Sequence, residues 1–225
     1  MDYRIFGNIL PAVEVRLQAG EAMYTQSGGM AWMSDGFKLE SNVKGGLMKG
    51  LGRMFSGESL FLATYTAGRP DSIIAFASTV PGKILAVDIA DTSLICQKGA
   101  FLCAQPEVEI STVLTKKLSS GFFGGEGFIL QSLHGSGMAF LEADGDVVER
   151  VLAPGEVIKV DTGNVLAFEP TVSYEIETVK GFKNILFGGE GLFLTRLTGP
   201  GKVYMQTMNI AEFTGRIAQG LPSSK

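Results

Sequence analysis

Three stretches of the chain share one pattern, and this pattern decides the fold. They read FSGESLFLATYTAG at 55–68, FGGEGFILQSLHGSG at 123–137 and FGGEGLFLTRLTGPG at 187–201. The starts are 68 and 64 residues apart, and each stretch places a glycine-rich turn before a nearly continuous apolar run. Such runs are typical of strands buried between two sheets. Self-similarity at this period predicts about three copies of one β unit.

Two further elements recur around these stretches. PGKILAVD at 81–88 resembles PGEVIKVD at 154–161, and each precedes a second strand-like segment, PEVEIST at 106–112 or PTVSYEIET at 170–178. In the last of these, apolar and polar side chains alternate with a period of two, as in a half-buried strand. The 30 glycines among 225 residues fit many tight turns, and 45% hydrophobic residues exclude a disordered chain.

These patterns predict an all-β fold, a double-stranded β-helix or jelly roll with three structural repeats around a pseudo-threefold axis. We expect a single domain over 1–225, with repeats at about 11–80, 81–153 and 154–208 and a helical tail at 209–225. Apolar residues recur every three or four positions from Ile210 to Leu221, which predicts a short helix that Pro222 ends. This helix is expected to pack against the outside of the barrel.

Charge and hydropathy limit the location and the partners. The net charge of −4 opposes binding to nucleic acid or anionic lipid. The N-terminal stretch has Asp2, Glu14 and Arg16 where an export signal needs a basic start and an apolar run, and 127–141 is too short to span a membrane. A cytoplasmic location is therefore expected. There Cys96 and Cys103 are predicted to be reduced and buried. If their segment is a hairpin that turns at 97–99, the two cysteines do not stand directly opposite one another.

As a set, the FGGEGF and FGGEGLF turns, the PGE…VD strand and GLMKGLGRMFSGESLF at 46–61 resemble the bacterial branch of the altered-inheritance-of-mitochondria family, over about 9–208. The resemblance implies a double-stranded β-helix related to the tryptophan RNA-binding attenuation protein, with three repeats. It implies no reaction: bacterial members are uncharacterised, and eukaryotic members are associated with the organisation of the mitochondrial inner membrane.

The repeated turn glutamates Glu58, Glu126 and Glu190 are the sharpest candidate site. If the turns converge, three carboxylates could bind a hard cation or share a proton. Alternatively, each glutamate accepts hydrogen bonds from the amides of its own turn. Serines replace two glycines in the first copy, which weakens the equivalence of the three sites.

Other chemistry finds little support in the sequence. His134 is the only histidine, so the several-histidine metal site of a cupin is excluded, and we expect this histidine to lie in an exposed turn. Neither a nucleophile elbow nor a phosphate-binding loop occurs. We therefore predict no catalytic residue, no metal site and no cofactor.

Lys44, Lys49 and Arg53 are candidate surface-contact residues, because they alternate with apolar residues at helical spacing. They could touch a membrane surface or RNA, or belong to a loop that covers the end of the barrel. Together, these observations favour a non-enzymatic homo-oligomer that binds an unknown protein partner or acts as a scaffold. RNA binding through the fold relation and a cation or enzyme site on the turn glutamates are the alternatives.

Overall fold

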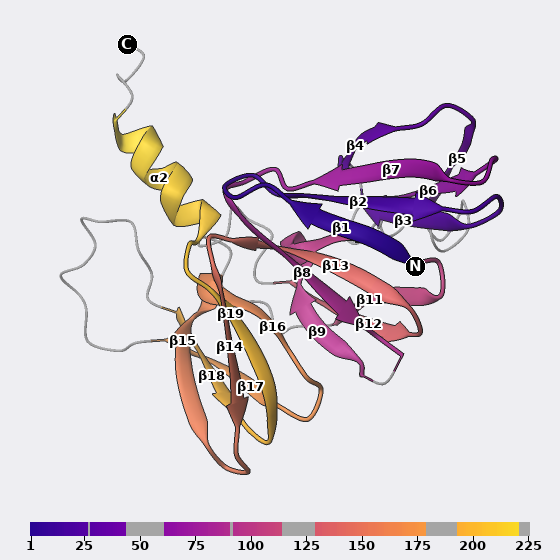
Figure 1. Ribbon diagram of the computed structural model, residues 1–225. Coiled ribbons are helices and arrows are strands. Elements are labelled where there is room, and N and C mark those ends of the chain that lie inside the picture. Colours follow the sequence, from indigo (N-terminus) through magenta and orange to yellow (C-terminus); the bar gives the residue numbers. More distant parts are fainter. Residues whose placement is uncertain (27, 44–60, 91, 114–128, 179–192, 221–225) are drawn as a thin grey trace.

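The computed structural model describes the chain except residues 27, 44–60, 91, 114–128, 179–192 and 221–225. The described part is almost entirely β, with four antiparallel sheets and one helix (Figure 1). Sheet A has the order β1-β2-β7-β4, with β1 (Asp2–Phe6), β2 (Ala12–Leu17), β7 (Ser72–Ala77) and β4 (Met30–Met33). Sheet D has the order β15-β18-β17, with β15 (Val157–Asp161), β18 (Phe193–Thr198) and β17 (Ser173–Thr178).

The two inner sheets have six strands each. Sheet B runs β5 (Phe37–Val43), β6 (Phe61–Ala67), β3 (Ala22–Gln26), β10 (Phe101–Ala104), β13 (Met138–Asp144) and β8 (Gly82–Asp88). Sheet C runs β11 (Val108–Val113), β12 (Leu130–Gly135), β9 (Leu94–Gln97), β16 (Val165–Phe168), β19 (Gly201–Gln206) and β14 (Val147–Leu152). The 3-10 turns η1 (Lys98–Ala100) and η2 (Thr162–Asn164) and the helix α2 (Ile210–Gly220) complete the described elements.

One pairing pattern occurs three times along the chain, in β2–β7, β8–β13 and β14–β19, which we call repeats 1, 2 and 3. Within each repeat the first and third strands pair with the sixth strand. The second and fourth strands pair with the fifth. The apolar runs that decided the fold are the fifth strands β6, β12 and β18, and all three contribute to the core as expected.

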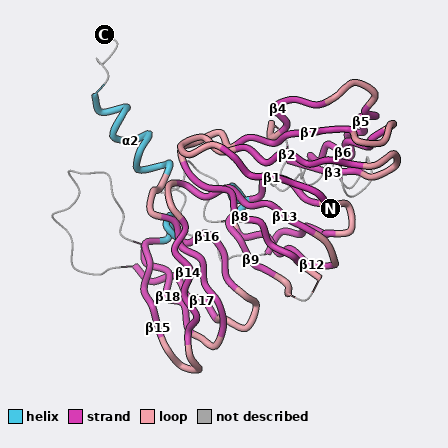
Figure 2. The backbone as a smooth tube through the Cα atoms, viewed as in Figure 1, coloured by secondary structure: helices cyan, strands magenta, loops and turns pink. Residues whose placement is uncertain are grey.

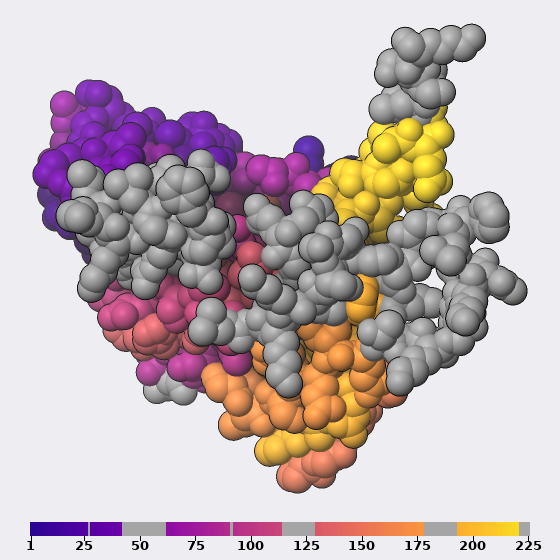
Figure 3. Space-filling view, turned by 180° about the vertical axis from the view of Figure 1, so that it is seen from behind, coloured from indigo at the N-terminus to yellow at the C-terminus, as the bar shows by residue number. Residues whose placement is uncertain are grey.

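Neighbouring repeats are joined through strand pairing. β3 of repeat 1 pairs with β10 of repeat 2, and β9 of repeat 2 pairs with β16 of repeat 3, so sheets B and C each combine two repeats. Among the described strands none of repeat 1 pairs with one of repeat 3. The repeats thus form an open row whose first and third members lie at opposite ends (Figures 1 and 3), and the pairing that would close a threefold arrangement is not present in it.

Three hydrophobic cores fill the spaces between successive sheets. The core between sheets A and B includes Val15, Phe76 and Phe140, and the core between sheets C and D includes Phe168 and Leu197. The middle core, between sheets B and C, contains Cys96 and Tyr24, among others. Because each inner sheet contributes side chains to two cores, the repeats share their hydrophobic burial and cannot be separated without exposing it.

The prediction of an all-β chain with a short C-terminal helix is confirmed, but the sequence misplaced the start of the third unit. The Pro-Gly turn at 81–82 leads into a first strand, β8, whereas the turn at 154–155 leads into a second strand, β15. The pairing therefore places β14 in repeat 3, although the boundary predicted at 153 assigned it to the second unit. A Pro-Gly turn can precede any strand, so it does not mark a unit boundary.

Two other local features differ from what the sequence suggested. Residues 97–99 do not turn a hairpin, because the chain passes there from β9 in sheet C to β10 in sheet B. The helix α2 does not pack on the sheets: none of its residues is buried, and it projects from the row (Figure 2). No helix in the described part of the chain is long and apolar enough to cross a bilayer.

Candidate functional site

The turn glutamates and the basic residues that the sequence singled out lie outside the described part of the chain. Glu58, Glu126 and Glu190 belong to the connections 44–60, 114–128 and 179–192, each of which joins the fourth strand of a repeat to the fifth. Lys44, Lys49 and Arg53 belong to the first of these connections. The convergence of the glutamates and the contacts of the basic residues therefore stay predictions.

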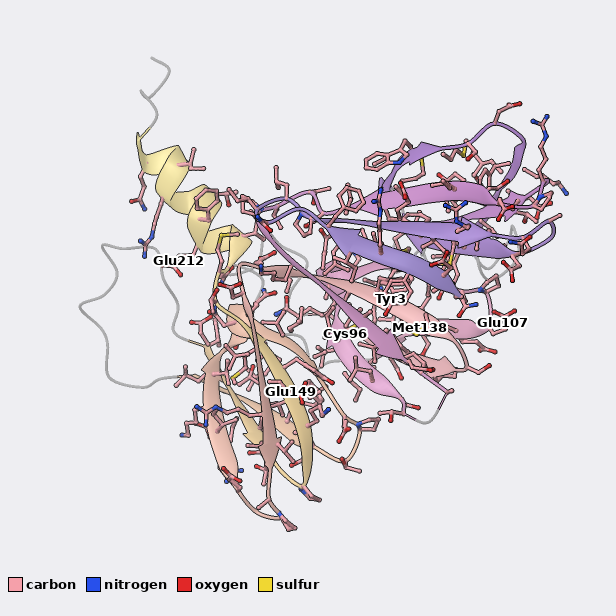
Figure 4. The ribbon with its side chains drawn as sticks, viewed as in Figure 1. Tyr3, Cys96, Glu107, Met138, Glu149 and Glu212 are labelled. Atoms are coloured by element: carbon pink, nitrogen blue, oxygen red, sulfur yellow. The ribbon has the colours of Figure 1, made fainter. Side chains whose placement is uncertain are left out.

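The remaining candidates for chemistry do not form a cluster. His134 lies near the end of β12, not in a turn, and its Nε2 is 3.4 Å from the Glu109 carboxylate on β11. Cys96 and Cys103 are free and buried as predicted; burial raises the pKa of the Cys96 thiol to about 12, so this thiol stays protonated at neutral pH. The described residues contain no group of three metal-ligating side chains, and acidic residues such as Glu107 and Glu149 lie far apart (Figure 4).

A cleft of about 220 Å³ lies at the seam between repeats 1 and 2. Its lining comes from β3, η1, β10 and β13, with Gln26, Lys98, Phe101 and Glu142 among its residues. The side-chain nitrogen of Gln26 is buried and has no hydrogen-bond partner in the described structure. Because an unpaired buried amide costs about 1–3 kcal/mol, the Gln26 side chain lowers the stability of the fold at this seam.

The equivalent position at the second seam is satisfied. Gln97, the last residue of β9 as Gln26 is of β3, donates from Nε2 to the carbonyl oxygens of Val165 and Thr162 in repeat 3. The side chain therefore bridges the two repeats there. Gln26 is thus a position where the equivalent amide has no acceptor in the described structure.

Glu142 places a partly buried carboxyl group at the cleft. Its Oε2 accepts hydrogen bonds from the Ser78 hydroxyl at 2.9 Å and the Thr79 amide at 3.2 Å. Burial raises the pKa of this carboxyl above its usual value, and burial also raises the pKa of Asp144, two residues along the same strand. The sequence offered no signal for this pair, because carboxylates on a strand are ordinary until their neighbours are known.

Glu142→Gln is expected to flatten part of the pH dependence of stability. A raised folded pKa means that the folded state holds the proton more tightly than the unfolded state, so wild-type stability falls as pH rises through the window above about 4.5. Glutamine keeps an acceptor for Ser78 and carries no charge. In urea titrations, the stability of the variant relative to wild type should therefore rise between pH 4.5 and pH 7.

The matched control is Glu107→Gln, which changes an exposed carboxylate on the turn before β11. The free energy of unfolding of this variant should follow that of wild type across the same pH range. A Glu142→Gln curve parallel to wild type would show that burial does not perturb this carboxyl.

The two ends of the row expose strand edges with large apolar side chains. On β4, the last strand of sheet A, Trp32 is 45% exposed and Met33 is 40% exposed. On β15, the first strand of sheet D, Val157 is 38% exposed. Among the described strands β4 pairs only with β7, and β15 only with β18. Unpaired backbone groups beside apolar side chains make these edges candidate interaction surfaces.

Helix α2 adds a second exposed apolar surface. Ile210, Phe213 and Ile217 lie on one face of the helix and are 36%, 42% and 50% exposed. The helix is held at its start, where the Ile210 amide donates to the Asp144 carboxylate at 2.9 Å. The periodicity predicted the helix correctly, but the apolar face that was expected to cover the sheets remains open.

Known proteins are similar to this chain in sequence and in structure. The family described as mitochondrial biogenesis AIM24 matches residues 3–208. An uncharacterised protein of Streptococcus pyogenes serotype M6 is 28% identical over an alignment of 222 residues that covers 95% of this chain and 88% of that protein. A crystal structure of a Streptococcus pyogenes protein superposes with a TM-score of 0.79 at 26% identity, covering 98% of this chain and 99% of the other. With the family match spanning nearly every described strand, the chain belongs to the mitochondrial biogenesis AIM24 family.

Proposed function

We propose that this protein is a non-enzymatic scaffold that acts in the cytoplasm as a homo-oligomer and binds a protein partner. The observation that carries the proposal is the exposed apolar surface at the ends of the row, with Trp32 and Met33 on one edge and Val157 on the other. Soluble monomers rarely leave such side chains together beside unpaired strand edges, because other chains then pair with them.

The exposed face of helix α2 supports a partner that is a protein. Amphipathic helices dock their apolar face into hydrophobic grooves, and three apolar residues at helical spacing are the usual anchors. The net charge of −4 disfavours a polyanionic partner. One alternative is RNA binding through a fold relation to the tryptophan RNA-binding attenuation protein, which the same charge opposes. The other is a cation or enzyme site on the turn glutamates, which lie outside the described residues.

The molar mass of the purified protein in solution tests the oligomer. Size-exclusion chromatography with multi-angle light scattering, on tag-free protein at micromolar concentration, should give a discrete mass that is a multiple of 23.9 kDa. Native mass spectrometry of the same sample counts the subunits. A mass of 23.9 kDa at every concentration would contradict the proposal.

A further inference from the structure

The two seams between repeats have the same register. At the first seam β10 pairs antiparallel with β3, and Cys103 stands opposite Thr25. At the second seam β16 pairs antiparallel with β9, and Ala167 stands opposite Cys96. All four residues are buried, with at most 2% of any of them exposed. At both seams, therefore, the third strand of one repeat pairs with the second strand of the repeat before it in the same register.

The first repeat carries the same kind of third strand, β4, which among the described strands pairs only with β7 of its own repeat. Each third strand has a register shift against its sixth strand, and the residue after the shift is Trp32 in β4, Cys103 in β10 and Ala167 in β16. Because the register shift occurs in all three strands, it identifies equivalent positions in them even though their residues differ. Trp32 thus occupies the position whose equivalents are buried in both seams.

The last repeat likewise carries a second strand, β15, which in the described part of the chain pairs only with β18 of its own repeat. In every repeat, the final residue of the second strand stands opposite a leucine of the fifth strand. The residue immediately before it is Thr25 in β3, Cys96 in β9 and Val160 in β15. Val160 therefore occupies the position that meets the third strand of the following repeat.

Each outer sheet has the same strand order as one half of an inner sheet. Sheet D, β17-β18-β15, has the fourth, fifth and second strands of a repeat, which is the order of one half of sheets B and C. Sheet A supplies the other half, the third, sixth and first strands β4-β7-β2, with β1 added outside. Placed edge to edge, β15 beside β4, they reproduce the strand order of both inner sheets.

We infer that β15 of one copy of this chain pairs antiparallel with β4 of a second copy, with Val160 opposite Trp32. The inference rests on the proposed function, because it specifies how the subunits of the oligomer join. The next pair along each seam is Ala104 opposite Tyr24 and Phe168 opposite Ile95. At the equivalent position of the proposed joint, Lys159 of one copy stands opposite Met33 of the other. Each copy uses both of its ends, so the contact is head to tail.

The side chains at this joint suit the pairing. Val160 is 8% exposed and belongs to the core between sheets C and D, so its opposite residue Trp32 would extend that core. On the other face, the aliphatic stem of Lys159 would cover Met33 while its ammonium group keeps its ion pair with Glu177, 2.6 Å away. The joint buries apolar surface and satisfies the open edges of both strands.

A designed disulfide tests the register. Opposed residues of antiparallel strands have Cα atoms about 4.5–5.5 Å apart, within the range that a disulfide bridges. Met33→Cys combined with Lys159→Cys should therefore give covalent dimers and higher species on non-reducing gels after mild oxidation. Either single variant should stay monomeric on the gel, as should the wild type, whose Cys96 and Cys103 are buried.

The matched control is Met33→Cys with Glu175→Cys. Glu175 is exposed on β17, the opposite edge of the same three-stranded sheet, so this pair should not cross-link. Trp32 is the only tryptophan, so emission from the unmodified protein gives an independent readout: its maximum should move to longer wavelength when dilution dissociates the oligomer. An intact oligomer without the Met33–Lys159 cross-link, or with Trp32 in a solvent-exposed environment, would overturn this pairing and leave the oligomer standing; a monomer at every concentration would overturn both.

Discussion

Phe140→Ala is expected to lower the free energy of unfolding by about 3–5 kcal/mol, the range for truncating a fully buried phenylalanine. Phe140 is 0% exposed on β13 of repeat 2, and its side chain belongs to the core between sheets A and B. Its ring forms an edge-to-face contact with the ring of Tyr3 on β1, with centroids 5.1 Å apart and planes inclined by 76°. Because this ring packs repeat 2 against the sheet that begins repeat 1, its removal leaves a cavity at their shared core.

Urea titration followed by circular dichroism measures this loss. Phe213→Ala is the matched control, because it truncates the same residue type on the exposed face of α2, where 42% of Phe213 is accessible. Its free energy of unfolding should stay within about 0.5 kcal/mol of wild type. A loss below about 1 kcal/mol for Phe140→Ala would mean that the ring is not packed as the structure places it.

Gly82→Ala is expected to destabilise the fold by about 3 kcal/mol or more, at the upper end of overpacking substitutions. Gly82 begins β8, and a Cβ atom there would overlap the carbonyl oxygen of Ala143 and lie 3.0 Å from the Gly145 amide. Both obstacles are backbone atoms, so a rotamer change cannot relieve them. The Gly82 amide also donates to the Ile9 carbonyl at 2.8 Å, and a shift of the strand would break that bond.

The matched control for this second prediction is Gly99→Ala. Gly99 lies in η1, and a Cβ atom there meets no atom within 4 Å. Thermal unfolding should show a large decrease of the midpoint for Gly82→Ala and little change for Gly99→Ala. Similar midpoints for the two variants would contradict the close approach of β8 and β13 at this turn.

Local periodicity predicted the three fifth strands, several other strands and the C-terminal helix. The two-residue alternation in 170–178 gave β17, and the three- and four-residue spacing after Asn209 gave α2. Whether the apolar face of α2 would be covered was not predictable, because amphipathicity states only that a face can be buried. A hairpin at 97–99 could not be decided from the sequence for a similar reason: turn residues indicate a change of direction, not the sheet that the next strand enters.

The candidate interaction edges could not be predicted because strand pairing is non-local. β4 and β15 read as ordinary strands, and only comparison with the two inner seams shows that neither pairs with a strand of another repeat among the described residues. The importance of Trp32 rests on that register. The equivalence of Gln26 and Gln97 could have been predicted from the sequence, because both residues end the second strand of a repeat. Finding it requires an alignment of the second strands of the repeats in addition to the fifth strands.

The pairing of β3 with β10 and β9 with β16 also bears on how the chain comes apart. In a linear array of this kind, stability is the sum of each unit's own contribution and of its contacts with nearest neighbours. Repeat 2 has two such neighbours and each outer repeat has one, so backbone amides of β9 and β10 exchange with solvent only after an outer repeat has opened. In the single chain, unfolding therefore begins at the ends and proceeds inward; joining the ends of two copies would give the outer repeats the protection that the middle repeat already has.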